Sequence, residues 1–411
     1  MEISGDDIAD AVLKQFDSWE KKRKPLARPN GVREWVPLSG IVAQGTNGFT
    51  CLAAATGMKC LPQKSVPQAQ GVVLHDWHAE VLAIRSFNRF LLEECNSLAL
   101  SKKKSSEYVR VRDEFERTDS QFQPFALKDG INLHMYCSEA PCGDASMELT
   151  MASQDDATPW SLPQSIDTLS PETPHIADSG QEPILHGRSY FSALGIVRRK
   201  PSRPDAPPTL SKSCTDKLSL KQSTSLLSSI ASLLISPANI YIHTLVLPSS
   251  QLSTTAVTRA FSPSGRLEPL VGNQWEGGYS FKHFRILSTE KEFAFSRRSA
   301  KDVVPSNIAS SWMPNSTETL IGGTLQGRKQ FDVRGASKVC KRRMWKLALE
   351  VAVVAGMPDV ERCLRMKKYG DFKEAGLLDG RNQVKGDVRG VLGGWVRNEG
   401  GGVFGVEGVE I

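Results

Sequence analysis

The chain has 411 residues, of which 40% are hydrophobic and 23% charged, as in a globular protein with one large or two ordinary domains. It contains no apolar run of about 18 residues, so we predict no membrane span. Its net charge of +6 slightly favours a polyanionic partner. The acidic N-terminus lacks the features of a signal peptide, so we expect an intracellular protein in the nucleus, the cytoplasm or both. The eight cysteines are then expected to be buried thiols or metal ligands rather than disulfides.

Helical and strand patterns alternate through the first half of the chain. Apolar residues recur at helical spacing near the N-terminus and again after residue 76. Between these helices, β-prone runs are interrupted by glycines. The expected elements are a helix over 1–25, strands and turns over 35–60, a helix over 76–95, a short buried strand over 131–138 and helix-like sequence from Cys142. This alternation favours an α/β core.

The second half begins with a segment of different composition. Residues 151–186 are rich in Ser, Thr, Asp and Pro and poor in apolar residues, which predicts a disordered insertion. The elements expected beyond it are an irregular loop over 198–213, a helix over 215–236, a strand over 240–248, helices over 338–356 and 359–368, and a flexible tail over 399–411. Since the insertion separates motifs that we assign to one site, we expect a single domain over 1–411 with its core at about 35–398.

Three short motifs carry residues suited to metal binding and proton transfer. They are His78-Ala79-Glu80, Pro141-Cys142-Gly143-Asp144-Ala145 and Ser213-Cys214-Thr215-Asp216-Lys217. One histidine and two cysteines can supply the three protein ligands of a catalytic zinc ion, which leaves a fourth position open and lowers the pKa of a bound water to about 7. A carboxylate that does not bind the metal, such as Glu80, can then take and deliver protons.

The spacing of these motifs departs from the zinc deaminase signature, in which H-x-E is followed by P-C-x-x-C. Cys142 is followed by Gly-Asp-Ala, so the second cysteine has to come from elsewhere in the chain. Cys214 is our candidate, and Cys137 is the next one. Each motif also occurs by chance or as a turn with a buried thiol, so the residues alone leave a purely structural role open.

Taken together, the motifs resemble the RNA adenosine deaminase family. The resemblance rests on LHDWHAEVLAIRSFNRFL at 74–91, LHMYCSEAPCGDASM at 133–147 and GIVRRKPSRPDAPPTLSKSCTDK at 195–217, with shorter matches at 55–60, 305–312, 336–345 and 393–398. The branch that acts on transfer RNA is the closer match, in the LHDxHAE context and in the run before Cys214. We also expect no double-stranded RNA-binding domain, because few residues precede the core.

The resemblance implies a cytidine-deaminase-like α/β/α layered core with additional C-terminal helices. It implies that His78, Cys142 and Cys214 bind zinc and that Glu80 shuttles protons. The implied reaction is hydrolytic deamination of adenosine to inosine in a transfer RNA, immediately 3′ of the anticodon, with alanine tRNA as the expected substrate. The expected partner is tRNA; we expect no membrane association and infer no obligate protein partner.

The family also buries inositol hexakisphosphate in a basic pocket, which requires many Lys and Arg groups. Ile84 and Leu220 stand where the editing enzymes have arginine, and Lys221 stands where they have tryptophan. Trp77 replaces the usual cysteine beside the ligand histidine. The positions that match the pocket are Arg85, Lys217, Lys341, Tyr369, Lys373, Lys385 and Trp395.

RNA phosphates are expected to bind a basic loop that leads into Cys214. A run of this kind is also typical of a solvated loop. His75 and Asp76 are expected to support His78 rather than to take part in catalysis. The residues expected to hold RNA are Arg198, Arg199, Lys200 and Arg203.

Three other functions fit parts of the pattern. A general editing enzyme for double-stranded RNA is the first, and the short N-terminal region argues against it. A cytidine deaminase acting on free nucleosides is disfavoured by the missing C-x-x-C and the large C-terminal extension. A non-catalytic zinc-containing RNA-binding protein is disfavoured by Glu80, since structural zinc sites are usually closed by four protein ligands.

Overall fold

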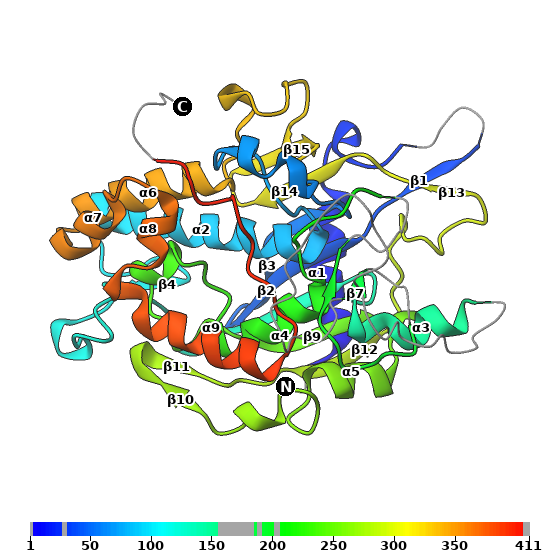
Figure 1. The fold of residues 1–411 in the computed structure, drawn as a ribbon, viewed down its shortest axis with the longest axis horizontal. Helices are drawn as coiled ribbons and strands as arrows, with labels where there is room; N and C mark the ends of the chain where they lie inside the picture. Colours follow the sequence, from blue (N-terminus) through cyan, green and yellow to red (C-terminus); the bar gives the residue numbers. More distant parts are fainter. Residues whose placement is uncertain (1–2, 27–30, 155–184, 187–190, 201–205, 406–411) are drawn as a thin grey trace, which may run out of the picture.

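The chain folds around one large mixed β-sheet, with helices packed against it (Figure 1). The computed structural model describes residues 3–26, 31–154, 185–186, 191–200 and 206–405. The insertion predicted over 151–186 therefore lies outside the described residues, except at its two ends.

The sheet has eight strands within the described residues, in the order β12-β9-β6-β2-β3-β14-β15-β16. β12, β9 and β6 are parallel, whereas the pairs from β6–β2 to β15–β16 are antiparallel. The strands predicted within 35–60, 131–138 and 240–248 are confirmed. In sheet order the strands are β12 (Arg285–Thr289), β9 (Ile242–Pro248), β6 (Asn132–Cys137), β2 (Leu38–Gly45), β3 (Gly48–Thr56), β14 (Ala309–Met313), β15 (Ser316–Ile321) and β16 (Thr324–Leu325).

The helices lie on both sides of this sheet. α6 packs beside α2 and α9 packs beside α4, so the C-terminal helices extend the core (Figure 1). No helix in the described part of the chain has the length and apolarity of a membrane span. The α-helices are α1 (Gly5–Asp17), α2 (Ala79–Ser101), α3 (Met147–Ala152), α4 (Cys214–Thr224), α5 (Thr254–Phe261), α6 (Lys341–Val354), α7 (Pro358–Leu364), α8 (Tyr369–Lys373) and α9 (Asp379–Val391).

Successive residues of the central strands face opposite layers of helices, because side chains alternate along a strand. Ile41 and Met135 belong to the apolar core that includes the buried face of α2. The next residues, Val42 and Tyr136, belong to the core that includes the buried face of α1. Both faces of the sheet are thus covered, and the predicted α/β/α layered fold is confirmed.

Four short two-stranded pairs lie outside the main sheet within the described residues. The loop predicted over 198–213 begins with one of these strands, and residues 201–205 lie outside the described part. The pairs are β1 (Arg33–Trp35) with β13 (Val303–Pro305), β4 (Val109–Val111) with β5 (Phe125–Leu127), β7 (Leu185–His186) with β8 (Arg198–Arg199) and β10 (Gln274–Trp275) with β11 (Tyr279–Ser280).

The helix predicted over 215–236 is wrong in its second half, because α4 ends at Thr224. Ser225 has a φ of +57°, which a continuing right-handed helix does not allow. Asn88 then holds the following segment, since its amide donates to the Leu226 carbonyl at 3.0 Å and its side-chain oxygen accepts from the Ser228 N–H at 2.6 Å. The leucines after α4 are buried on all sides in an irregular segment, and complete burial produces the same apolar density as a helix.

The C-terminal tail was expected to be flexible, but one residue of its described part, Phe404, is packed into the core. Phe404 is 5% exposed, and its ring stacks on Tyr369 with a centroid separation of 5.0 Å. Tyr369 also donates its backbone N–H to the Phe404 carbonyl at 2.8 Å. Residues 406–411 lie outside the described part of the chain.

Gly40 provides a test of the packing between α1 and the sheet. A Cβ at Gly40 would lie 2.6 Å from Val12 Cγ2 on α1, so Gly40→Ala should destabilise the protein by about 1–3 kcal/mol through overpacking. In Gly40→Ala/Val12→Ala, the new methyl group occupies the space that the valine leaves. The double variant should therefore be more stable than the sum of the single effects predicts, by about 0.5–3 kcal/mol in urea unfolding. Strictly additive effects would contradict this contact.

Candidate metal centre and active site

The start of α2 places His78 and Glu80 at the same end of the helix. His78 is the N-cap residue with extended backbone, and Glu80 lies in the first turn. The end of β3 anchors this helix start, since Ala79 donates its N–H to the Gly57 carbonyl at 2.9 Å. Gly57 has a φ of +147°, and a Cβ there would lie 2.1 Å from the Trp77 carbonyl oxygen. The glycine is therefore needed for the close approach that positions both residues.

Cys142 and Cys214 meet although they are 72 residues apart. Cys142 lies in the turn after β6, and Cys214 is the first residue of α4. The Cys214 N–H donates to Cys142 Sγ at 3.3 Å, and the Thr215 N–H donates to the Cys142 carbonyl at 3.0 Å. Gly143 permits this contact, because a Cβ there would lie 2.3 Å from Ser213 Oγ. The structure thus brings the two predicted cysteine ligands together, whereas the ligand atoms of His78 and of both thiols do not all lie within 4.8 Å of one another.

A chain of buried polar contacts connects the cysteine pair with His78. Lys200 donates from Nζ to Cys214 Sγ at 3.2 Å and to Asp76 Oδ2 at 2.9 Å. The other carboxylate oxygen of Asp76, Oδ1, lies 2.9 Å from His78 Nδ1. Asp76 and Lys200 are 3% and 2% exposed, so their charges interact out of contact with bulk water. Asp76 thus supports His78, as the sequence suggested.

Interactions within this group shift the pKa values of its members. Hydrogen bonding to Cys214 lowers the pKa of the Cys142 thiol well below its usual value, and the Lys200 ammonium contributes to this shift. Burial raises the pKa of Cys214 well above its usual value, and the charge on Cys142 adds to it. Burial acts to lower the pKa of His78, but its anionic neighbours, including Asp76, raise it to about 10. The cysteine pair therefore favours one thiolate, the form that binds metal.

Glu80 contributes a carboxyl group to the same site. It is 7% exposed, and it forms no salt bridge within the described residues. Burial raises the pKa of the carboxyl group, and the nearby Cys142 raises it further. A buried carboxyl group beside the thiols, without a structural ion pair, is suited to holding and releasing a proton.

A second group of metal-binding side chains also includes His78. Cys60, Asp76 and His78 are the one set of three in the described residues whose ligand atoms all lie within 4.8 Å of one another. Cys60 Sγ lies 3.6 Å from His78 Nδ1. Sequence reasoning did not place Cys60 at the site, and its only signal was the segment ATGMKC at 55–60.

Asp76 is too firmly held to be readily available as a metal ligand. Its Oδ2 accepts hydrogen bonds from Lys200, Lys217 and Ser211. Burial alone would raise the pKa of Asp76, but Lys200 and Lys217 hold it well below its usual value. This ionised carboxylate is thus committed to its lysine partners and to the orientation of His78. Cys137, the alternative ligand from the sequence, is buried at the end of β6, and burial raises the pKa of its thiol.

Cationic side chains gather beyond Asp76, where the polyanion pocket was predicted. Burial and neighbouring cations lower the pKa of Lys341 to about 7 and that of Lys385 to about 5. The charged neighbours that cause these shifts are themselves cations, so this cluster has an excess of buried positive charge. The predicted pocket residues come from Arg85 on α2, Lys217 on α4, Lys341 on α6, Tyr369 and Lys373 on α8, Lys385 on α9 and Trp395 beyond it.

Aromatic rings and the C-terminal segment border this cation cluster. Lys341 Nζ lies 5.3 Å from the centre of the Tyr369 ring and donates to the Gly401 carbonyl at 3.2 Å. Trp395 lies against both Lys212 and Arg389, at 5.8 and 5.9 Å from the ring centre. The C-terminal segment therefore contacts the cluster at Gly401.

The cluster contains two further basic residues. Arg381 was not predicted from the sequence, and Lys221 stands where the editing enzymes have tryptophan. Arg381, on α9, is 4% exposed and donates to the Thr224 and Leu227 carbonyls. Lys221 donates from Nζ to the Leu226 and Leu227 carbonyls, and burial together with Arg381 holds its pKa well below the usual value. Lys221 thus adds a further basic group to the cluster, whose charged form is disfavoured unless an anion lies nearby.

The loop predicted to hold RNA phosphates is largely turned inward. Arg198 and Lys200 are 1% and 2% exposed, and Lys200 is committed to Asp76 and Cys214. Their burial argues against phosphate contact and makes Lys200 part of the site itself. Arg199 is half-buried, and Arg203 lies outside the described residues.

A buried carboxyl group beside paired thiols and an imidazole, on one side of a layered α/β sheet, is the arrangement of a hydrolytic deaminase. Residues 53–398 match the model of the adenosine-deaminase (editase) domain, and the chain belongs to this family.

Curated relatives divide into two kinds. The chain is 37% identical to the tRNA-specific adenosine deaminase 1 of Schizosaccharomyces pombe, over 96% of this chain and 95% of the relative. It is 34% identical to the protein of the same name in Saccharomyces cerevisiae, over 54% of this chain and 53% of the relative. It is 26% identical to the double-stranded RNA-specific editase Adar of Drosophila melanogaster, over 80% of this chain but only 44% of the relative.

Proposed function

We propose that the protein deaminates adenosine to inosine in a transfer RNA, at the adenosine immediately 3′ of the anticodon, with alanine tRNA as the expected substrate. The observation that carries this proposal is the buried Glu80 carboxyl group beside Cys142 and Cys214, in a chain related along 96% of its length to a tRNA-specific adenosine deaminase. An intracellular location stays a prediction.

His78, Cys142 and Cys214 are the residues that would hold zinc. Imidazole and thiolate are the ligand types that zinc prefers, and three protein ligands leave one position open for chemistry. The contact between the two cysteines and the lowered pKa of Cys142 support this set. The competing set with Cys60 requires Asp76, whose carboxylate is already bound to two lysines. Asp76 instead has the role of a carboxylate that orients a metal-binding histidine.

Glu80 is the proton-transfer group in this proposal. Bound zinc would make water acidic enough to supply a nucleophile near neutral pH. The Glu80 carboxyl group can accept a proton from that water and deliver it to the ring nitrogen and the leaving amine of adenine. Burial raises the pKa of Glu80, so the carboxylate, once it has accepted the proton from water, can hold that proton until it is delivered to adenine.

A transfer RNA suits this site because the reacting carbon of adenine is inaccessible in a stacked duplex. An anticodon loop presents an adenosine with little unpairing cost. Arg199 and Arg203 are the two residues of the basic loop that we retain as candidates for phosphate contact, since Arg198 and Lys200 are buried.

The buried cation cluster fits inositol hexakisphosphate. Burying uncompensated cations is costly, so a cluster that contains Lys341, Lys373, Lys385 and Arg381 calls for an anion with several charges. A bound polyanion would favour the charged form of Lys221, which would then offset part of the loss of the arginines that the editing enzymes have at Ile84 and Leu220.

The two ligand sets make different predictions for single cysteine variants. Cys142→Ala and Cys214→Ala should lose most of their zinc, because each removes one of three protein ligands. Cys60→Ala should keep a metal content close to that of the unaltered protein, measured by inductively coupled plasma mass spectrometry. Zinc lost from Cys60→Ala but retained by the other two variants would assign the metal to Cys60, Asp76 and His78.

The reaction and its substrate can be tested together with Glu80→Gln. The unaltered protein should form inosine next to the anticodon in a panel of transcribed tRNAs. Glu80→Gln should bind zinc and tRNA normally but deaminate about 10²–10⁴-fold more slowly, because the amide cannot transfer the proton. Equal turnover by both proteins would contradict the role of Glu80. Inosine in duplex RNA but not in any tRNA would favour an editing enzyme for double-stranded RNA.

The polyanion proposal predicts both a bound molecule and a pH effect. Mass spectrometry of the denatured protein should detect inositol hexakisphosphate. In protein refolded without it, Lys341 and Lys385 have folded pKa values of about 7 and about 5, below the unfolded value. The unfolded chain then binds more protons, so the melting temperature should rise between about pH 6 and about pH 9. Added inositol hexakisphosphate should raise it most at the lower pH. A melting temperature independent of the ligand would contradict the proposal.

A further inference from the structure

The aspartate two residues after Cys142 is held by an arginine. Asp144 is completely buried, and Arg259 donates from Nε to both carboxylate oxygens at 3.1 Å. Arg259 also donates from Nη2 to the Asp144 carbonyl at 3.0 Å. Its guanidinium further contacts Glu148, in the helix that follows, and the Gly195 N–H donates to Asp144 at 2.7 Å. Arg259 thus fixes the backbone immediately after the first cysteine.

The aspartate two residues after Cys214 is also held by an arginine. Asp216 is completely buried, and Arg266 donates from Nη1 to its Oδ1 at 2.7 Å. Arg266 also donates from Nη2 to Ser219 Oγ at 2.8 Å, one turn further along α4. Ser213 donates to the other oxygen of Asp216 at 2.5 Å. Arg266 therefore fixes the start of the helix that carries the second cysteine.

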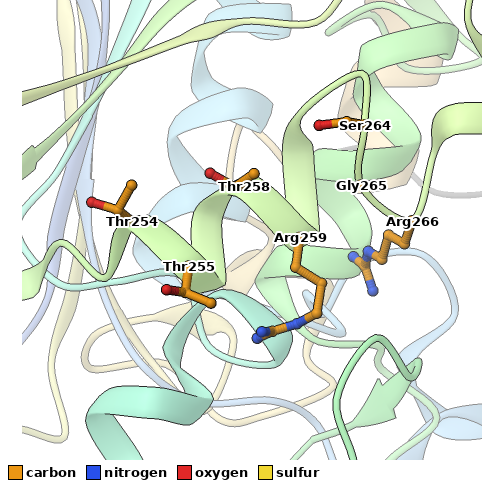
Figure 2. Close-up of a pocket in the computed structure, with 7 residues that line it drawn as sticks. All are labelled: Thr254, Thr255, Thr258, Arg259, Ser264, Gly265 and Arg266. Atoms are coloured by element: carbon orange, nitrogen blue, oxygen red, sulfur yellow. The ribbon is translucent and has the colours of Figure 1, made fainter.

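Both arginines belong to one short segment, formed by α5 and the turn after it. The Arg266 N–H donates to the Arg259 carbonyl at 2.9 Å, which joins the two directly. Figure 2 shows both side chains extending from this segment. The two arginines line a pocket together with Ser264 and the threonines of α5, which belong to the same segment. A single structural unit is thus bonded to the aspartate that lies two residues after each of the two cysteines.

We propose that Arg259 and Arg266 are positioning residues that set the separation of the Cys142 and Cys214 thiols for metal binding. This inference rests on the proposed zinc ligands. A zinc site tolerates distance changes of only about 0.2 Å, whereas the two cysteines come from segments far apart in the sequence. The two ion pairs, Arg259 with Asp144 and Arg266 with Asp216, restrict the movement of the two cysteine segments, because each buried aspartate can move only if its ion pair is broken.

Conservative variants separate this role from a general contribution to stability. Arg259→Lys and Arg266→Lys keep the charge but lose the planar fork that binds two acceptors. Arg110→Lys is the matched control, because Arg110, in the middle of β4, forms a fork with Glu116 through two hydrogen bonds of 2.7 Å. Within the described residues, this pair has no hydrogen bond to the cysteine segments. All three variants keep the positive charge and lose the fork.

The measurement is the absorption spectrum of the cobalt-substituted full-length protein, together with zinc release to a chelator. Arg259→Lys and Arg266→Lys should shift the thiolate-to-cobalt bands and release zinc about 10–100-fold faster than the unaltered protein. Their kcat should fall, while KM for tRNA stays unchanged. Arg110→Lys should leave the bands, zinc release and kcat unaltered, even if it lowers the melting temperature.

If the absorption bands and zinc release of Arg259→Lys and Arg266→Lys match those of Arg110→Lys, the positioning role is overturned. Should either lysine variant fail to fold, Asp144→Asn and Glu148→Gln provide the same comparison within one ion-pair network. Asp144→Asn should shift the bands, and Glu148→Gln should not; identical spectra would overturn the proposal. Absence of thiolate-to-cobalt bands in the unaltered protein would instead contradict the proposed zinc ligands, and the positioning role with them.

Discussion

The buried carboxylate of Asp76 has to be paired with cations, since an isolated buried charge costs several kcal/mol. Its partners come from separate parts of the chain: His78 at the start of α2, Lys200 after β8 and Lys217 in α4. Meeting this requirement fixes the helix start that carries Glu80 relative to the helix that carries Cys214. The catalytic geometry thus depends on one satisfied buried charge.

Asp76 also lies between two regions of opposite electrostatic character. On one side, the Cys142 and Cys214 thiols favour a shared negative charge, which Lys200 stabilises. On the other side, Lys341 and Lys385 are crowded by further cations. A metal cation suits the first region and a polyanion the second. The two proposed ligands would therefore each offset a charge excess that the fold itself creates.

Local patterns identified the principal secondary structure and the chemical residues. The strand that precedes Cys142 and the long helix after His78 follow directly from apolar periodicity. The helix predicted to continue after Thr224 was wrong, because side chains buried on every side give the same apolar density in the sequence as a helix. The same reasoning also failed at Phe404, because one aromatic residue in a glycine-rich tail gives no periodic signal. Arg198 and Lys200 were interpreted as surface cations, since a basic run does not reveal which of its charges have buried partners.

The sequence by itself determined the α/β class, the candidate residues His78, Glu80, Cys142 and Cys214, and the resemblance to RNA adenosine deaminases. These depend on local periodicity and on short motifs whose chemistry is carried within a few residues. Only the tertiary structure decided that Lys200 joins Asp76 to Cys214, that Cys60 lies beside His78, and that Arg259 and Arg266 bracket the cysteines. Such contacts join residues distant in the sequence, and their partners are selected by burial and charge pairing, which no local pattern records.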